Sequence, residues 1–258
     1  MKKTRLQAHR GVSTEAPENT VAAFKMSVEQ GYDIIELDTK YTKDGKCVVL
    51  HDPTLNRTCR LPGGKSIQDE LKISDITLEE ALSFDAGIAM DSRFAGEKIP
   101  TFVDMLDFFK NNSISCKIDN VWESFTAEQK TDFIELVKAS GAEKKMGFSC
   151  QNLENLKRVV KELPGCEIHW DGALDEEILH EVKRIAAKHR LTIWIRYDNK
   201  TTSWSKYPFA TPELCDKIRQ FGKVGIWILS EAEELRKAVT DFKADAIETT
   251  GSIKPWML

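Results

Sequence analysis

The chain has 258 residues, of which 41% are hydrophobic and 30% are charged, and its formal net charge is −4. This composition is typical of a globular domain, and α/β barrels commonly reach this length as one unit. The weak negative charge disfavours general electrostatic binding to nucleic acid or anionic lipid, so we predict no nucleic-acid partner. The sequence has no apolar run of about 18 residues, and we predict no membrane span.

Six cysteines are scattered along the chain without a C-x-x-C pair. Isolated thiols of this kind are typical of small buried residues in a reducing compartment, which favours the cytoplasm. The basic start Met1-Lys2-Lys3 is not followed by the apolar region of a signal peptide. A leader removed ahead of residue 1 stays an alternative, and the sequence does not predict an oligomeric state.

Short apolar runs alternate with stretches of helical periodicity along the whole chain. We predict helices over residues 19–30, 102–110, 126–140, 152–163, 175–189, 212–221 and 232–242. We predict strands over residues 4–9, 33–38, 114–119, 146–149, 166–170, 191–196, 224–229 and 245–248. Eight strands that alternate with helices predict a parallel sheet closed into a TIM-like (β/α)8 barrel.

A short insertion is expected after the second strand. Residues 46–51 form a further extended run, and residues 52–98 are irregular apart from a helical stretch near 77–83. Long structured loops in compact domains usually serve function. We therefore predict one domain, residues 1–258, with 52–98 as an insertion that covers the C-terminal mouth of the barrel.

Ionisable residues gather where the predicted strands end, which is where such barrels place their active sites. Glu36 and Asp38 share one face of a strand, because side chains two residues apart point the same way. Two carboxylates aimed together repel each other unless a cation lies between them. This stretch predicts a hard-cation site, with His51 nearby as an acid or base. An edge strand with solvated carboxylates is the alternative.

Several short motifs follow one another in a fixed order. They are His9-Arg10-Gly11, Pro17-Glu18-Asn19-Thr20, Glu36-Leu37-Asp38, Asp44-Gly45 and His51-Asp52-Pro53-Thr54-Leu55-Asn56-Arg57-Thr58. In order and spacing this set resembles the glycerophosphodiester phosphodiesterase family. The resemblance covers nearly the whole chain and is densest over residues 9–102.

The resemblance implies a TIM-like barrel that hydrolyses glycerophosphodiesters to glycerol 3-phosphate and an alcohol with a divalent cation, Mg²⁺ or Ca²⁺. Carried over by motif, His9 and His51 match the general acid/base pair, and Arg10 matches the phosphate contact. Glu36 and Asp38 match two metal ligands. Trp227, on a late strand, is a candidate for the wall of the substrate site.

The third strand departs from the family pattern Asn-Ile-Glu-Ile-Lys, in which the Glu is the third metal ligand and the Lys contacts phosphate. This chain reads Ser115-Cys116-Lys117-Ile118-Asp119. Lys117 and Asp119 share a face in either register. We expect Asp119 to be the third ligand and Lys117 to lie at the substrate. Alternatively, Lys117 takes the cation's place and the site is metal-free or inactive.

Two other functions stay open at this point. The changed third strand would suit a relative that acts on another substrate, such as a sugar-containing ligand without phosphate. Polar and aromatic residues at 169–171 and 196–198 could then form a different pocket. A non-catalytic binding protein is the third alternative, although the pair of histidines argues against it. We also expect Asn19 to cap the first helix.

Overall fold

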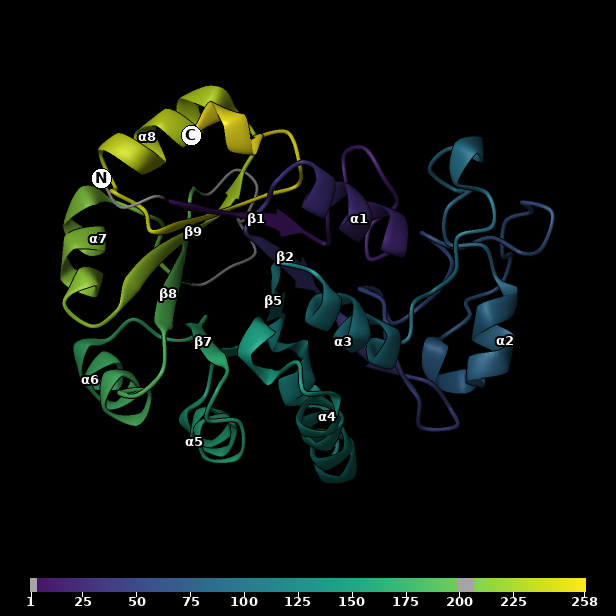
Figure 1. Cartoon of the computed structure of the whole chain (residues 1–258), viewed down its shortest axis with the longest axis horizontal. Helices are drawn as coiled ribbons and strands as arrows, with labels where there is room; N and C mark the ends of the chain where they lie inside the picture. The colour runs from purple at the N-terminus through teal and green to yellow at the C-terminus, as the bar shows by residue number, and fades with distance from the viewer. Residues whose placement is uncertain (1–3, 199–206) are drawn as a thin grey trace.

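The computed structural model describes residues 4–198 and 207–258. Parallel strands form a closed barrel, and helices surround it (Figure 1). The barrel strands are β1 (Arg5–His9), β2 (Ile34–Leu37), β5 (Ser115–Ile118), β6 (Met146–Cys150), β7 (Glu167–Trp170), β8 (Leu191–Arg196), β9 (Lys223–Leu229) and β10 (Ala246–Thr249). They bond to one another in this order, and β10 returns to β1. The predicted TIM-like (β/α)8 barrel is therefore confirmed.

The helices that join these strands lie close to their predicted positions. They are α1 (Val21–Glu29), α3 (Phe102–Asn111), α4 (Ala127–Ser140), α5 (Leu153–Glu162), α6 (Glu176–Ile185), α7 (Pro212–Arg219) and α8 (Ala232–Thr240). Side-chain caps set several of their starts; for example, Thr126 and Gln129 form a reciprocal capping box at α4. The prediction that Asn19 caps α1 is wrong. The cap is Thr20, whose side chain accepts from the Ala23 N–H, and the amide of Asn19 points elsewhere.

Helices and barrel share one large apolar core. Aromatic rings bridge the layers where α3, α4 and β6 meet, with Phe102 and Phe133 stacked at 4.4 Å between ring centroids and Phe148 edge-on to Phe133. All three side chains are fully buried. Burial of such rings contributes on the order of 2–3 kcal/mol each, so this packing holds the strand ends in fixed positions.

The insertion begins with a hairpin that the sequence predicted only in part. Strands β3 (Thr39–Tyr41) and β4 (Cys47–Val49) pair antiparallel outside the barrel. Beyond them lie η1 (Ile73–Asp75), α2 (Leu78–Ser83) and η2 (Ser92–Phe94). Ten buried residues form a second, smaller core there: Val48, Leu50, Leu55, Cys59, Ile73, Ile76, Ala81, Phe84, Ala86 and Ile99.

In Figure 1 the bulk of the insertion stands to one side of the barrel, beyond α1 and α3. The segment directly after β4 reaches the mouth of the barrel. His51 lines a pocket there, and Arg57 donates a hydrogen bond to Glu18. That residues 52–98 cover the mouth stays a prediction.

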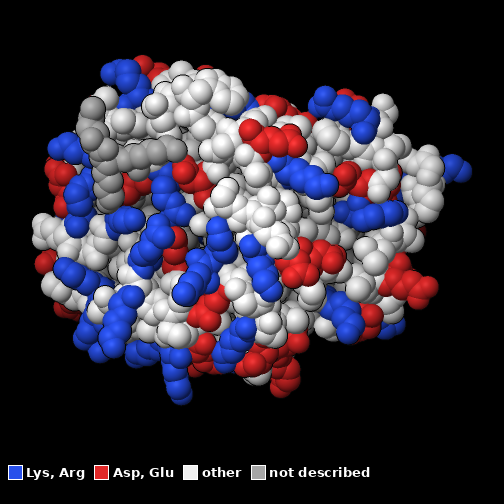
Figure 2. Space-filling view, in the orientation of Figure 1, with Lys and Arg blue, Asp and Glu red and all other residues white. Residues whose placement is uncertain are grey.

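Basic and acidic side chains are interspersed over most of the face drawn in Figure 2. Among the described residues, no helix has the length and apolar character that crossing a membrane requires.

Candidate active site

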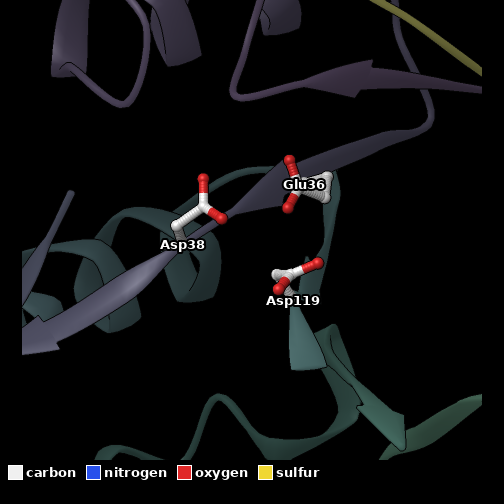
Figure 3. A group of neighbouring side chains, drawn as sticks. All are labelled: Glu36, Asp38 and Asp119. Carbon is white, nitrogen blue, oxygen red and sulfur yellow. The ribbon is translucent and has the colours of Figure 1, made fainter. Parts of the chain in front are cut away.

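Three carboxylates from two neighbouring strands meet at the mouth of the barrel. Glu36 and Asp38 come from the end of β2, and Asp119 directly follows β5 (Figure 3). The Asp119 N–H donates to the carbonyl of Leu37 at 3.0 Å, which brings Asp119 beside the end of β2. One oxygen from each carboxylate lies within 4.8 Å of the others. The structure therefore brings together the three predicted metal ligands.

This donor set fits a hard divalent cation. Burial, reinforced by Asp38 and Glu248, raises the pKa of Glu36 well above its usual value. Burial and the Asp38 charge likewise raise the pKa of Asp119 to about 6. Crowded carboxylates of this kind are costly to ionise, and a cation between them removes that cost. Oxygen-only ligands are those that Mg²⁺ and Ca²⁺ prefer.

A strained turn after β1 places Arg10 against these carboxylates. Arg10 has a backbone φ of +59°, and Gly11 follows at +80°. A side chain at Gly11 would meet Ala23 at 2.7 Å, so glycine is required there. The Arg10 N–H donates to Glu36 Oε2 at 3.0 Å, and the guanidinium Nε lies 3.3 Å from Asp38 Oδ2. The turn therefore fixes one ligand by its backbone and another by its side chain.

Asn19 and Glu18 support the same corner. Asn19 Nδ2 donates to Asp38 Oδ2 at 2.9 Å, and Glu18 Oε1 accepts from Arg10 Nη1 at 3.0 Å. Burial lowers the pKa of Arg10, but the charges of Asp38, Glu36 and Glu18 outweigh it and raise the pKa overall. Arg10 therefore stays charged.

His9 ends β1 in the barrel interior. Its Nε2 lies 3.9 Å from Glu36 Oε2 and 3.9 Å from Glu248 Oε1. Burial is the largest cause of its lowered pKa, and it outweighs the opposing effect of Glu248. His9 is thus a mostly enclosed imidazole between two carboxylates.

His51 reaches the site from the insertion and is held by a chain of charged groups. Its Nδ1 lies 2.6 Å from Asp52 Oδ1, and because a carboxylate only accepts, this nitrogen carries the proton. Arg57 donates to both Asp52 oxygens at 2.6 and 3.0 Å, and to both Glu18 oxygens at 2.7 Å. This arrangement leaves His51 Nε2 for a substrate.

Lys117 is buried in the barrel interior. Its Nζ lies 3.5 Å from Asp171 Oδ2, 3.6 Å from Glu248 Oε2 and 4.7 Å from the centre of the Trp194 ring. Burial alone would lower its pKa, but Asp171 and Glu248 outweigh burial and raise it. Gln7 also donates to Glu248. The ammonium is therefore compensated first by Asp171 and Glu248, and the cluster carboxylates Glu36 and Asp119 add to this with smaller effects.

A pocket of about 660 Å³ opens beside the three carboxylates. Its walls are Asp38, Lys40, His51, Asp119, Asn120, Val121, Glu123, Ser124, Gln151 and Asn152. Most of these follow β5 and β6, and η3 (Asn120–Ser124) forms one side. Trp122 anchors η3 by donating to the Ser149 carbonyl at 2.7 Å. The second predicted histidine thus shares one cavity with two of the predicted ligands.

Comparison with known proteins assigns the chain to a family. The model of the glycerophosphoryl diester phosphodiesterase family matches residues 9–227. The chain belongs to this family. It is 32% identical over 243 residues to the glycerophosphodiester phosphodiesterase of Caldanaerobacter subterraneus subsp. tengcongensis, a match that covers 92% of this chain and 90% of the relative. Its enzyme class is therefore that of phosphoric diester hydrolases.

Solved structures agree on the fold of this family member. A phosphodiesterase of Oleispira antarctica, in complex with the product sn-glycerol-3-phosphate, superposes with a TM-score of 0.73 at 20% identity and covers 96% of this chain and 93% of its own. Glycerophosphodiester phosphodiesterase from Agrobacterium tumefaciens gives a TM-score of 0.69 at 21% identity, over 96% and 95% of the two chains.

Three residues of this chain that the sequence analysis considered for substrate contact lie away from the described pocket. Trp227 lies on β9 and does not line it, so its role at the substrate stays a prediction. His169 and Trp170, considered for an alternative pocket, are each 1% exposed. His169 Nδ1 accepts from Trp194 Nε1 at 2.9 Å, and a Cβ at Gly147 would lie 2.3 Å from its Nε2. His169 packs in the barrel interior, and Trp170, on the opposite face of β7, packs in the apolar core around the barrel, so neither forms a wall of the described pocket.

Two functional candidates escaped the sequence analysis. Glu248 faces both His9 and Lys117, and Arg57 orders the surroundings of His51. Arg57 stands within the motif His51–Thr58, and this position was the signal for it. Glu248 ends the predicted strand 245–248, which was a signal of the same kind, but its partners come from strands distant in the sequence.

Proposed function

We propose that the protein hydrolyses glycerophosphodiesters to a phosphomonoester and an alcohol, with a divalent cation held by Glu36, Asp38 and Asp119. The convergence of these three carboxylates within 4.8 Å carries the proposal. The name of the Caldanaerobacter relative, and the sn-glycerol-3-phosphate bound to the Oleispira phosphodiesterase, support this substrate class. Mg²⁺ and Ca²⁺ both suit the ligands.

The cation, when bound, polarises a phosphoryl oxygen and neutralises the charge that develops on it. Arg10 is assigned to a second phosphoryl oxygen. Among the contacts of the described residues, Asp38 and Glu18 engage its Nε and Nη1, and Nη2 is available for the substrate. A guanidinium held on two sides presents this donor without further ordering.

The two histidines receive different roles because their surroundings differ. His51 lines the open pocket, and its Nδ1 donates to Asp52. With a second proton on Nε2, the imidazolium suits a general acid that gives the Nε2 proton to the leaving alkoxide. His9 lies inside the barrel against Glu36, which suits a base that takes the proton of the attacking oxygen. This attacker is water or the substrate's own glycerol hydroxyl.

Lys117 is assigned a supporting role rather than the cation's place. Its Nζ lies between Asp171 and Glu248, and these two carboxylates compensate its charge. Arg10 contacts Asp38, and the charge of Lys117 offsets only part of the effect that raises the pKa of Glu36 and Asp119. A lysine so placed supports a site that still requires a cation.

Release of glycerol 3-phosphate from glycerophosphocholine, followed by a coupled enzyme assay, tests the proposal. We expect turnover, and we expect a chelator to abolish it. His9→Ala and His51→Ala should each reduce turnover by orders of magnitude and leave the circular dichroism spectrum unchanged. Turnover of a phosphate-free glycoside that is insensitive to chelation would contradict it. Tight binding of the diester with no product would do so as well.

We also propose a cytoplasmic location. All six cysteines are free and buried, which supports a reducing compartment. Mass spectrometry after alkylation under native conditions should then find these thiols unmodified and without disulfides in freshly lysed cells.

A further inference from the structure

The pocket beside the metal cluster has a wall that the cluster itself does not use. Asp38, Lys40, His51 and Asp119 line the side of the pocket that adjoins the metal cluster. The outer wall comes from η3 and from the loop that leads into α5, and it contributes Asn120, Val121, Glu123, Ser124, Gln151 and Asn152. In a diester hydrolase, the space next to the general acid is where the leaving alcohol lies.

The chemistry of this outer wall is that of hydrogen bonding. Three of its side chains are amides and one is a hydroxyl, groups that both donate and accept. Among the described residues that line the pocket, Val121 is the one aliphatic side chain, and none is Phe, Tyr or Trp. A wall of this kind makes many directional polar contacts and little apolar contact.

Glu123 adds a fixed acceptor to the wall. Its Oε1 accepts from the backbone N–H groups of Gln151 and Asn152 at 3.1 and 3.4 Å. Its Oε2 is buried and makes no hydrogen bond of good geometry among the described residues, although the side chain of Asn155 lies close enough to act as a donor to this carboxylate. A buried carboxylate oxygen is costly to leave without a donor. A ligand that offers a hydroxyl would supply one.

We propose that this pocket binds the alcohol moiety of the diester and that this alcohol is a neutral polyol, such as glycerol, inositol or a sugar. The inference rests on the proposed function and narrows its substrate class. Each hydroxyl of a polyol donates and accepts, as Asn120, Gln151 and Glu123 require. The volume of about 660 Å³ has room for a six-membered ring with its hydroxyls.

The same wall is poorly suited to choline. A trimethylammonium group has no donor for Glu123, and proteins usually bind such groups on aromatic faces. Within residues 4–198 and 207–258, no Phe, Tyr or Trp side chain lines this pocket. We therefore expect the enzyme to discriminate between diesters that share glycerol phosphate and differ only in the alcohol.

The test compares kcat/KM for glycerophosphoinositol, glycerophosphocholine, glycerophosphoethanolamine and bis(p-nitrophenyl) phosphate, using the full chain with Mg²⁺ or Ca²⁺. We expect glycerophosphoinositol to exceed glycerophosphocholine at least tenfold. Gln151→Leu and Asn120→Leu should each reduce that ratio about five- to tenfold, since each removes hydrogen bonds to the polyol. Lys157→Leu, an exposed change on α5, is the matched control and should keep the ratio.

Equal or better turnover of glycerophosphocholine would overturn the inference while leaving the proposed function intact. A preference for the ethanolamine diester would also overturn it and assign Glu123 to an ammonium group. A preference for the inositol diester that Gln151→Leu and Asn120→Leu leave unchanged would place the polyol elsewhere. Absence of turnover on all four diesters would overturn the proposed function, and the inference with it.

Discussion

At the scale of single residues, the two histidines are not equivalent. The side chain of His51 is 40% exposed and that of His9 is 18% exposed, and only His51 lines the pocket. A general acid matters when the leaving group is a poor one. An alkoxide needs a proton as it departs, whereas p-nitrophenolate does not.

His51→Ala should therefore reduce turnover of glycerophosphocholine by about 10²–10⁴. On bis(p-nitrophenyl) phosphate the loss should be at least tenfold smaller. Steady-state kinetics on both substrates measure the difference, and His180→Ala, an exposed change on α6, is the control. Equal losses on the two substrates would show that His51 is not the acid.

His169 provides a pH-dependent prediction about stability. Burial, reinforced by the nearby charge of Lys117, holds the pKa of His169 well below 6.5. Below that pH the unfolded chain binds a proton that the folded chain does not, so acid favours unfolding. The contribution of His169 to the free energy of unfolding is fully present above pH 6.5. Below pH 6.5 it falls by at most about 1.4 kcal/mol per pH unit.

His169→Gln should remove this part of the acid sensitivity, because its carbonyl can still accept from Trp194 but does not titrate. From pH 7 to pH 5, wild type should lose more stability than the variant in urea unfolding, by up to about 2 kcal/mol. Parallel stability curves would mean that His169 is protonated in the folded protein.

Most single residues of the site could be predicted because they stand in short motifs. Glu36 and Asp38 share a strand face, and His9 and His51 end apolar runs. The hydrogen-bond partners of these residues could not be predicted from the sequence. The Asn19 amide was expected at a helix cap, but the left-handed backbone at that residue, φ +56°, turns it onto Asp38. The tendency of asparagine to cap helices was therefore outweighed by the hydrogen bond between Asn19 and Asp38.

At the scale of elements, the insertion is tied to the barrel through Arg57. This side chain joins Asp52, beside His51, to Glu18, which in turn contacts Arg10. The hydrogen bonds from Arg57 lower the pKa of Asp52 to about 2, so Asp52 stays charged under all working conditions. Arg57 thus positions His51 without touching the substrate.

Arg57→Met should reduce kcat for glycerophosphocholine about 10- to 100-fold with little change in KM, since the imidazole loses its fixed orientation. As with His51, the loss on bis(p-nitrophenyl) phosphate should be smaller. Arg57→Lys should recover little, because lysine cannot bridge two carboxylates bidentately. Lys65→Met in the same insertion is the control, and an equal loss on both substrates would reveal a merely structural role.

The boundaries of helices and strands could be predicted well where the hydrophobic periodicity was strong, as in α5 and β8. Where the periodicity was weak, the predicted boundaries were less accurate. Strand β3 reads Thr39-Lys40-Tyr41, too short and too polar to predict as a strand. Its pairing with β4 fixes where Asp38 leaves the barrel. The separate small core of the insertion was also unforeseen, because its members are spread over Val48 to Ile99.

At the scale of the whole molecule, the regular alternation of strands and helices was enough to predict a closed barrel. It could not show where Lys117 points. Closure brings β7 and β10 within reach of β5, so Asp171 and Glu248 compensate a lysine that lies far from them in the sequence. Such contacts across the barrel depend on all eight strands at once, which no local pattern encodes.

The central claim is that a divalent cation at Glu36, Asp38 and Asp119 is required for diester hydrolysis. The most direct test depletes the enzyme of metal with a chelator and then titrates Mg²⁺ or Ca²⁺ while following glycerol 3-phosphate release. Activity should vanish and return with the metal, and Asp119→Asn should need at least 10- to 100-fold more metal, whereas Asp132→Asn on α4 should behave as wild type. Full activity in the chelated enzyme, or an Asp119→Asn titration that overlays wild type, would contradict the account.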